Sequence, residues 1–324
     1  MNIVIPDDYQ NAVERLACFS ALEDHEVTIW REPAGSFEEL VQRLHPAEVI
    51  VAIRERVDFS HALIARLPNL RLIALVGRNA TTIDYAACTK YGVMVSTGKS
   101  NSPTSPAELT VALMMAARRN IVLEAERMRR GEWPCTLSHR MRGSTLGIFG
   151  LGNIGSLVAQ AGAGLGMNVL AWGQDTSRKR AESAGYGFAA SKQDLFERSD
   201  VLSLHVRLRP DTAGIVTAED LARMKPTALL INTSRAELIA PDALLNGLRA
   251  GRPGYAAVDV YEKEPILDGG HPFLSMPNVV CTPHLGWAEW DNFELYFSEA
   301  FEQIVAFAAG APMRLANPDV KPRG

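Results

Sequence analysis

The chain has few cysteines, no long apolar run and no strong charge imbalance, and each shortage excludes a class of protein. Its cysteines, at positions 18, 88, 135 and 281, form no CxxC pair, so neither a zinc knuckle nor a dithiol motif is indicated. No stretch reaches the roughly 18 apolar residues of a membrane span. The formal net charge of -4 offers no basic field for nucleic acid. We therefore expect reduced thiols, and neither a nucleic-acid nor a membrane partner.

The N-terminus also lacks the features of a secretory signal. It turns acidic at Asp7 and Asp8 after a short apolar stretch, without a cationic start. We expect a cytoplasmic protein. With 324 residues, the chain is long enough for two domains that each have a core.

Short apolar runs alternate with helix-length segments along most of the chain, and this alternation favours parallel βαβ units. The strand candidates of the first half are 2–5, 25–30, 48–53, 71–76 and 93–95. Those of the second half are 146–150, 168–172, 200–205, 227–232, 255–259 and 279–281. The predicted fold class is α/β, with two doubly wound domains.

Two segments suggest how the domains are connected. The loop-rich stretch 98–106 marks a domain crossing, and Ser105 is predicted to cap a helix over 107–118. After Gly286 a second helix is predicted to return to the first domain. Its apolar residues recur at helical spacing, at Phe293, Phe297, Ala300 and Ile304.

A glycine-rich loop, Gly150-Leu-Gly-Asn-Ile-Gly155, stands between a predicted strand and a predicted helix. Such a loop needs one glycine for the turn, one for close approach to a pyrophosphate and one for packing of helix on strand. The motif alone also fits a plain strand-to-helix turn. Its flanking elements favour a dinucleotide site, and the expected contacts are Gly150, Gly152, Asn153, Ile154 and Gly155.

The choice between NAD and NADP is less determined by the sequence. Gly173 occupies the position where an acid usually binds the adenosine ribose, and Asp175 follows two residues later. The basic run 178–180 could instead pair with a 2′-phosphate, or could be a solvated helix face. We expect NAD, with Asp175 at the ribose. His205, at a strand end, is expected to line the cofactor crevice.

Arg235, Glu264 and His284 follow successive predicted strands, and their side chains suit hydride transfer to a 2-oxo acid. Arginine offers a planar fork to a carboxylate. Histidine titrates near neutrality and can exchange a proton with the substrate oxygen. A carboxylate on its other ring nitrogen would fix the tautomer and stabilise imidazolium. Each residue alone could instead be a surface charge or a core histidine.

Together these residues resemble the D-isomer-specific 2-hydroxyacid dehydrogenase family. The resemblance rests on Pro106-Ala-Glu108, Gly150 to Gly155, Asp200-Val-Leu-Ser-Leu-His205, Asn232-Thr-Ser-Arg235, Asp259-Val-Tyr-Glu-Lys-Glu-Pro265 and Pro283-His284. It implies a flavodoxin-like substrate domain, 1–100 plus 288–324, and an inserted Rossmann NAD(P)-binding domain, 101–287. It also implies a homodimer formed through the cofactor domain.

The resemblance further implies roles for individual residues. Arg235, Glu264 and His284 would be catalytic, and Arg235 would also bind substrate. Asp259 would hold the nicotinamide carboxamide, and Thr233 would contact the cofactor. The backbone around Gly77 and Arg78 would receive the substrate carboxylate. No HExxH or clustered ligand spacing indicates a metal.

The expected activity is NAD(P)-dependent hydride transfer between a D-2-hydroxy acid and its 2-oxo acid, of the phosphoglycerate, glycerate, hydroxypyruvate or glyoxylate type. Two alternatives stay open. One is a corepressor-like protein that senses a nucleotide with little turnover. The other is a dehydrogenase of a different small anion, such as formate or phosphite.

Overall fold

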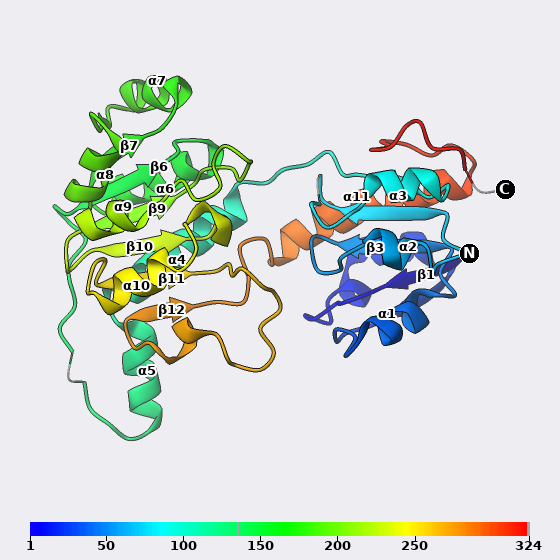
Figure 1. Cartoon of the computed structure of the whole chain (residues 1–324), viewed down its shortest axis with the longest axis horizontal. Coiled ribbons are helices and arrows are strands. Elements are labelled where there is room, and N and C mark those ends of the chain that lie inside the picture. Colours follow the sequence, from blue (N-terminus) through cyan, green and yellow to red (C-terminus); the bar gives the residue numbers. More distant parts are fainter. Residues whose placement is uncertain (79, 135, 323–324) are drawn as a thin grey trace. The chain divides into compact units, whose positions relative to one another are not determined.

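The structure is a computed structural model that describes residues 1–78, 80–134 and 136–322. It divides into two compact units, one comprising Met1–Ser102 with Glu289–Gly324 and the other comprising Pro103–Ala288 (Figure 1). The chain therefore crosses between units at Ser102–Pro103 and again at Ala288–Glu289. Among the described residues, no helix has the length and apolar character needed to cross a bilayer.

The first unit is built on a parallel sheet in the order β2-β1-β3-β4-β5, which is the flavodoxin-like order. Its strands are β1 (Asn2–Ile5), β2 (Glu26–Ile29), β3 (Val49–Ile53), β4 (Leu72–Val76) and β5 (Met94–Ser96). Every residue of the central strands β3 and β4 is buried, as expected for strands covered on both faces.

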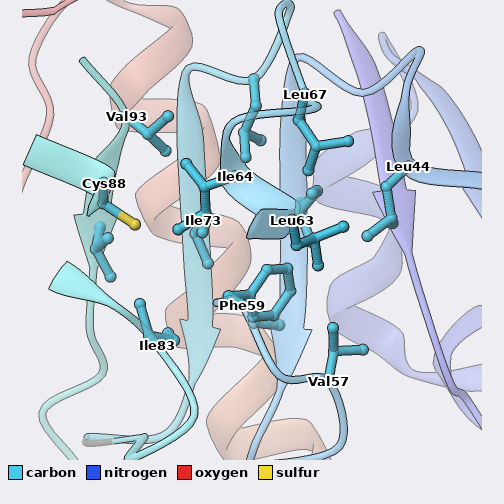
Figure 2. Close-up of a cluster of buried hydrophobic side chains, with 14 of the residues drawn as sticks. Leu44, Val57, Phe59, Leu63, Ile64, Leu67, Ile73, Ile83, Cys88 and Val93 are labelled. Atoms are coloured by element: carbon cyan, nitrogen blue, oxygen red, sulfur yellow. The ribbon is translucent and has the colours of Figure 1, made fainter. Parts of the chain in front are cut away.

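Helices and short 3-10 turns cover this sheet. They are η1 (Val13–Arg15), η2 (Ala17–Leu22), α1 (Phe37–Leu44), α2 (His61–Ile64), α3 (Tyr85–Lys90) and α11 (Trp290–Ala308). Figure 2 shows a core cluster that includes Phe59, Leu63 and Ile73, with α11 behind the sheet. Each fully buried side chain of this size contributes about 1.5–3 kcal/mol. The helix α11 packs on β4 and η2, as its apolar periodicity predicts.

The second unit is built on a parallel sheet in the order β12-β11-β10-β9-β6-β7-β8, the Rossmann order continued by one strand. Its strands are β6 (Thr145–Phe149), β7 (Asn168–Trp172), β8 (Gly187–Phe188), β9 (Val201–Leu204), β10 (Leu229–Asn232), β11 (Tyr255–Val258) and β12 (Val279–Cys281). The direction of winding reverses between β6 and β9, so the crevice beyond these two strands is where a ligand is expected.

Helices lie on both faces of this sheet. They are α4 (Thr104–Arg118), α5 (Ile121–Arg129), α6 (Asn153–Gly164), α7 (Asp175–Ala184), α8 (Lys192–Arg198), α9 (Ala218–Arg223) and α10 (Ala243–Arg249), with 3-10 turns η3 (Ala236–Leu238) and η4 (Pro272–Ser275). In β10, Leu229 and Ile231 join the core beneath α4 and α6, whereas Leu230 joins the core beneath α8 to α10. This alternation follows from the two-residue period of a strand.

The fold confirms the α/β prediction, with three local corrections. The crossover helix begins at Thr104, so Ser105 lies inside its first turn and is not the cap. The short edge strand β8 and the helix α5 were not predicted, because neither carries enough apolar periodicity to be recognised. Cys88 is buried, Cys18 and Cys281 are partly buried, and Cys135 lies outside the described residues.

Candidate active site

The glycine-rich loop connects β6 to α6, with Gly152 as the N-terminal cap residue of the helix. Gly150 has a φ of +96°, and a Cβ there would lie 2.8 Å from the carbonyl oxygen of His205. A Cβ at Gly155 would lie 2.4 Å from the carbonyl oxygen of Gly150. A larger residue is therefore excluded at Gly150 by the backbone at the end of β9. At Gly155 it is excluded by the backbone of the loop on which α6 packs.

Gly152 differs from these two glycines. A Cβ at this position would meet no atom within 4 Å, so no described protein atom requires a glycine there. The first turn of α6 begins at this point, and glycine has no side chain that could cap the backbone N–H groups of that turn. Open space in front of the N–H groups at a helix N-terminus fits a pyrophosphate, as a dinucleotide site requires.

The helix α7 supports the loop from the other side. Leu151 N–H donates to Ser177 Oγ at 3.2 Å, and Arg180 Nη1 donates to the Leu151 carbonyl oxygen at 3.2 Å. A Cβ at Gly173 would lie 2.9 Å from Ser177 Oγ, so Ser177 occupies the space next to the usual ribose-binding position. Asp175 is exposed as the first residue of α7.

The other members of the basic run have separate environments. The Arg178 guanidinium lies 4.2 Å above the centre of the Phe188 ring in β8. With Arg180 bound to the glycine-rich loop, two of the three cations of 178–180 have protein partners.

His205 follows β9, next to Gly150. Its Nε2 lies 2.9 Å from Ser203 Oγ, and burial lowers the pKa of His205 to about 4. The ring is therefore neutral at physiological pH. A neutral ring that hydrogen-bonds with a serine fits a lining role and not proton transfer.

The loop that carries Arg235 is fixed by the buried residue Asn232 at the end of β10. Asn232 Oδ1 accepts from Ser234 N–H at 3.1 Å, and Asn232 Nδ2 donates to the Arg235 carbonyl oxygen at 2.9 Å. Thr233 Oγ1 lies 2.7 Å from Thr110 Oγ1 on α4. These contacts set the backbone from which the half-buried Arg235 side chain extends.

His284 Nδ1 lies 2.6 Å from Glu264 Oε2, so the structure brings together the predicted histidine and acid. The second carboxylate oxygen, Oε1, accepts from Tyr261 N–H at 2.9 Å. Burial raises the pKa of Glu264, but the hydrogen bond and charge of His284, then the Tyr261 N–H and the Arg235 charge, bring it below its ordinary value. Glu264 is therefore an ionised partner for an imidazolium, and the positive charge of Arg235 helps to keep the pKa of Glu264 low.

Asp259 is fully buried at the end of β11, and its carboxylate holds the loop that contains His284. Oδ1 accepts from Thr282 Oγ1 and from Leu285 N–H, each at 2.7 Å, and Oδ2 accepts from Gly286 N–H at 2.9 Å. Burial raises the pKa of Asp259, and these donors partly offset the effect. His284 has a left-handed φ of +53°, which is uncommon outside glycine, and Asp259 binds residues on both sides of it.

Gly77 and Arg78 lie in the first unit, just after β4. Gly77 has a φ of +121°, and a Cβ at this residue would lie 2.9 Å from Arg54 Nη1. Arg78 is exposed and lines a cavity of about 350 Å³ together with Ala80, Thr81, Tyr85, Thr97 and Ala316. Two guanidinium groups thus stand at the carboxyl ends of adjacent parallel strands, β3 and β4.

Several residues that shape the site were not singled out from the sequence. Ser177 looks like an ordinary helix residue, and Tyr261 looks like a strand-end aromatic. His271 is partly buried, caps η4 and packs against Tyr261. The Asp259-to-Pro265 motif was a signal for Tyr261, but its hydrogen bonds depend on the fold of two loops. In the part of the chain that the structure describes, no cluster of three or more histidine, cysteine or acidic residues could hold a metal.

Comparison with known proteins places these features in a wider set. Residues 111–286 match the family model of the NAD binding domain of D-isomer specific 2-hydroxyacid dehydrogenases. A solved oxidoreductase from Ralstonia solanacearum, provisionally called a D-3-phosphoglycerate dehydrogenase, is 46% identical and superposes with a TM-score of 0.94. The similarity covers 98% of this chain and 97% of that one.

Curated relatives are more distant in sequence. The glycerate dehydrogenase of Methylorubrum extorquens is 34% identical over 86% of this chain and 88% of its own length. The D-3-phosphoglycerate dehydrogenase of Methanocaldococcus jannaschii is 36% identical over 77% of this chain. That match spans only 47% of the relative, so this chain corresponds to about half of the longer enzyme.

Proposed function

Since this chain belongs to the D-isomer specific 2-hydroxyacid dehydrogenases, we propose that it reduces a small 2-oxo acid to the D-2-hydroxy acid, and catalyses the reverse reaction. The single observation that carries the proposal is the Glu264–His284 pair at 2.6 Å, in the same unit as the glycine-rich loop. A histidine held by a carboxylate is the expected partner of hydride transfer, because the transfer leaves a proton to be supplied or removed.

We assign the proton to Nε2 of His284, since Nδ1 is bound to Glu264. In reduction, Nε2–H would donate to the developing alkoxide at C2, and in oxidation neutral Nε2 would accept the hydroxyl proton. Glu264 would stabilise the imidazolium without taking the proton. Arg235 would bind the substrate carboxylate and the C2 oxygen through its planar fork.

The residues of the second unit fit a nicotinamide dinucleotide. Gly152 and the first turn of α6 would hold its pyrophosphate, while Asn153, Ile154, Thr233, His205 and Asp259 are proposed to line its path. When bound, the cofactor supplies the hydride donor or acceptor. We propose NAD as the preferred form, because Arg178 and Arg180 already have protein partners and Asp175 would repel a 2′-phosphate.

The first unit favours a substrate with a second anionic group. We propose that the backbone at Gly77 and Arg78 binds the substrate carboxylate, and that the guanidinium groups of Arg54 and Arg78 attract a phosphate or second carboxylate. The phosphoglycerate type is therefore the first candidate among the substrates considered. Glycerate, hydroxypyruvate and glyoxylate lack that second anion and would be weaker substrates.

The helix α5 and the chain after it favour a homodimer formed through the second unit. This arm exposes large apolar side chains, among them Met128 at 67%, Trp133 at 80% and Leu137 at 94%. Exposed apolar groups of this size commonly mark a protein interface. A second copy of the same chain is the proposed occupant.

The test is consumption of reduced cofactor by the purified protein over a panel of 2-oxo acids, with NADH and NADPH in parallel. We expect turnover with NADH, highest with 3-phosphohydroxypyruvate. His284→Ala should lower kcat about a hundredfold or more, whereas His45→Ala, at an exposed histidine, should leave it unchanged.

Three results would contradict the proposal. Full turnover in His284→Ala would remove the assigned proton donor. Cofactor binding without turnover on any 2-oxo acid would favour the sensing alternative, and reduction of NAD by formate or phosphite would favour another anion as substrate.

A further inference from the structure

Two loops of the second unit are joined at several points around His284. The segment 259–265 follows β11, and the segment 282–286 follows β12, which pairs with β11 in parallel. Asp259 binds the second segment by its carboxylate, and Glu264 binds it through His284. Tyr261, between these two acids, hydrogen-bonds to two groups that each bind His284, the Thr282 carbonyl and the Glu264 carboxylate.

The hydroxyl of Tyr261 acts on the backbone of His284. Tyr261 Oη donates to the Thr282 carbonyl oxygen at 3.1 Å, and His284 N–H donates to the same oxygen at 3.1 Å. The two donors therefore meet on one acceptor. A carbonyl fixed by the tyrosine in turn fixes the peptide from which the imidazole extends.

The main chain of Tyr261 acts on the ring of His284. Its N–H donates to Glu264 Oε1, and Glu264 Oε2 binds His284 Nδ1. A carboxylate held at both oxygens cannot rotate freely away from the imidazole. The same residue thus determines the position of the histidine backbone and the orientation of the carboxylate that aligns its ring.

The tyrosine ring is itself held in place. Tyr261 is only 8% exposed, and the His271 ring packs edge-on against it with centroids 5.0 Å apart. A residue fixed at its ring, hydroxyl and main chain can transmit its position to its partners.

We propose that Tyr261 is a positioning residue for catalysis, which aligns His284 through the Thr282 carbonyl and through Glu264. The inference rests on the proposed role of His284 as proton donor. A tyrosine that only fills the core would also be buried. Its hydroxyl, however, would not be expected to affect the proton-transfer step.

The experiment compares Tyr261→Phe with the wild type and with Tyr186→Phe, a matched loss of one hydroxyl beyond α7 in the same unit. Tyr261→Phe should lower kcat about threefold to tenfold, as the loss of one hydrogen bond would. The KM for NADH should not change. Tyr186→Phe should behave as the wild type.

A second background separates positioning from packing. If the tyrosine acts through His284, Tyr261→Phe should have much less effect in a His284→Ala background than in the wild type. Equal losses in both backgrounds would overturn the inference, because the hydroxyl would then act independently of His284. Unchanged kcat in Tyr261→Phe would also overturn it, while leaving the proposed function intact.

The hydrogen bond between His284 Nδ1 and Glu264 supplies a readout that does not need turnover. The NMR signal of its proton can be assigned by its loss in His284→Asn. We expect this signal to shift or broaden in Tyr261→Phe, since the Thr282 carbonyl would lose the tyrosine hydroxyl and His284 would be aligned less well with Glu264. An unchanged signal would count against Tyr261 even if no substrate were found.

Discussion

Asp7 and His284 are non-glycine residues with left-handed backbone conformations, each at the end of a loop that bears charged groups. Such a conformation persists only where surrounding contacts hold it. At His284 the contacts come from Asp259, on residues to both sides. At Asp7 they include the Arg56 guanidinium, whose Nη1 donates to the Asp7 carbonyl oxygen, and Arg56 also lies 4.5 Å from the centre of the Tyr9 ring.

Asp7 gives a prediction on the pH dependence of stability. Burial raises its pKa to about 6 from an ordinary 3.8, against the charges of Arg56 and Arg43. The folded state binds this proton more tightly than the unfolded state, so protonation of Asp7 stabilises the fold. The stabilisation is complete below pH 3.8 and is lost as the pH rises through about 6. Relative to a neutral residue, ionised Asp7 then costs about 3 kcal/mol at pH 8.

Asp7→Asn should therefore raise the free energy of unfolding at pH 8 and have little effect at pH 4. Asparagine also tolerates the left-handed backbone. Urea unfolding at the two pH values measures the difference. An equal change at both would show that the effect is unrelated to the charge. Asp58→Asn, at an exposed acid, is the control.

Single residues also show where sequence reasoning reached its limit. Arg235, Glu264 and His284 were proposed as site residues from the sequence because each lies beyond a strand and has a side chain suited to the chemistry, and their roles stay predictions. Tyr261 and Ser177 were not proposed, because their roles depend on which backbone atoms of a distant loop come within hydrogen-bond distance. A sequence pattern specifies the element on which a residue lies, but not those distances.

Among elements, the glycine-rich turn before α6 is the one whose sequence and geometry agree most closely. Gly155 meets backbone, and Gly152 faces open space. Gly155→Ala should destabilise the fold of the loop and lower the melting temperature. Gly152→Ala should leave the melting temperature nearly unchanged while raising the Kd for NADH about tenfold or more, because its methyl group would occupy the space proposed for the pyrophosphate.

Gly164→Ala is the control in the same helix, since a Cβ there also meets no atom within 4 Å. It should retain NADH binding and stabilise the helix by up to about 1 kcal/mol. Calorimetric titration and thermal unfolding separate the three variants. Unaltered NADH affinity in Gly152→Ala would contradict the assigned pyrophosphate position.

The elements predicted best were strands of the two sheets. The candidates 2–5, 168–172 and 279–281 coincide with β1, β7 and β12, because apolar runs bounded by turns have few alternative readings. The strand β8 is two residues long and takes its structure from pairing with β7. The helix α5 buries none of its residues, so it leaves no one-sided apolar pattern to recognise.

At the scale of the whole molecule, the exposed arm around α5 makes a prediction about assembly. Wild-type protein should sediment at about twice the 35.4 kDa mass of the chain. Trp133→Glu combined with Leu137→Glu should give the monomer, because two charges would be buried in the interface. Leu295→Glu, at an exposed leucine of α11, should remain dimeric. A wild type that sediments as a monomer at micromolar concentration would contradict the proposed dimer.

The domain bounds expected from the sequence stay a prediction, because they rest on loop composition near 98–106 and on the new helical period after Gly286. The structure divides into its two units at Ser102–Pro103 and at Ala288–Glu289. The proposed substrate preference, in contrast, depends on side chains in the loops that follow β3 and β4. Their register has no repeating pattern in the sequence. The proposed preference for a second anion therefore rests on Arg54 and Arg78 as the fold arranges them.

The measurement that tests the central claim most directly is the fate of deuterium from NADH labelled at C4 of the nicotinamide. Reduction of the best 2-oxo acid should yield the D-2-hydroxy acid with deuterium bound to C2, detected by mass spectrometry and NMR. Transfer of the label should be slower by about a hundredfold or more in His284→Ala. Product without deuterium from either C4-labelled epimer of NADH, or product of the L configuration, would contradict the account.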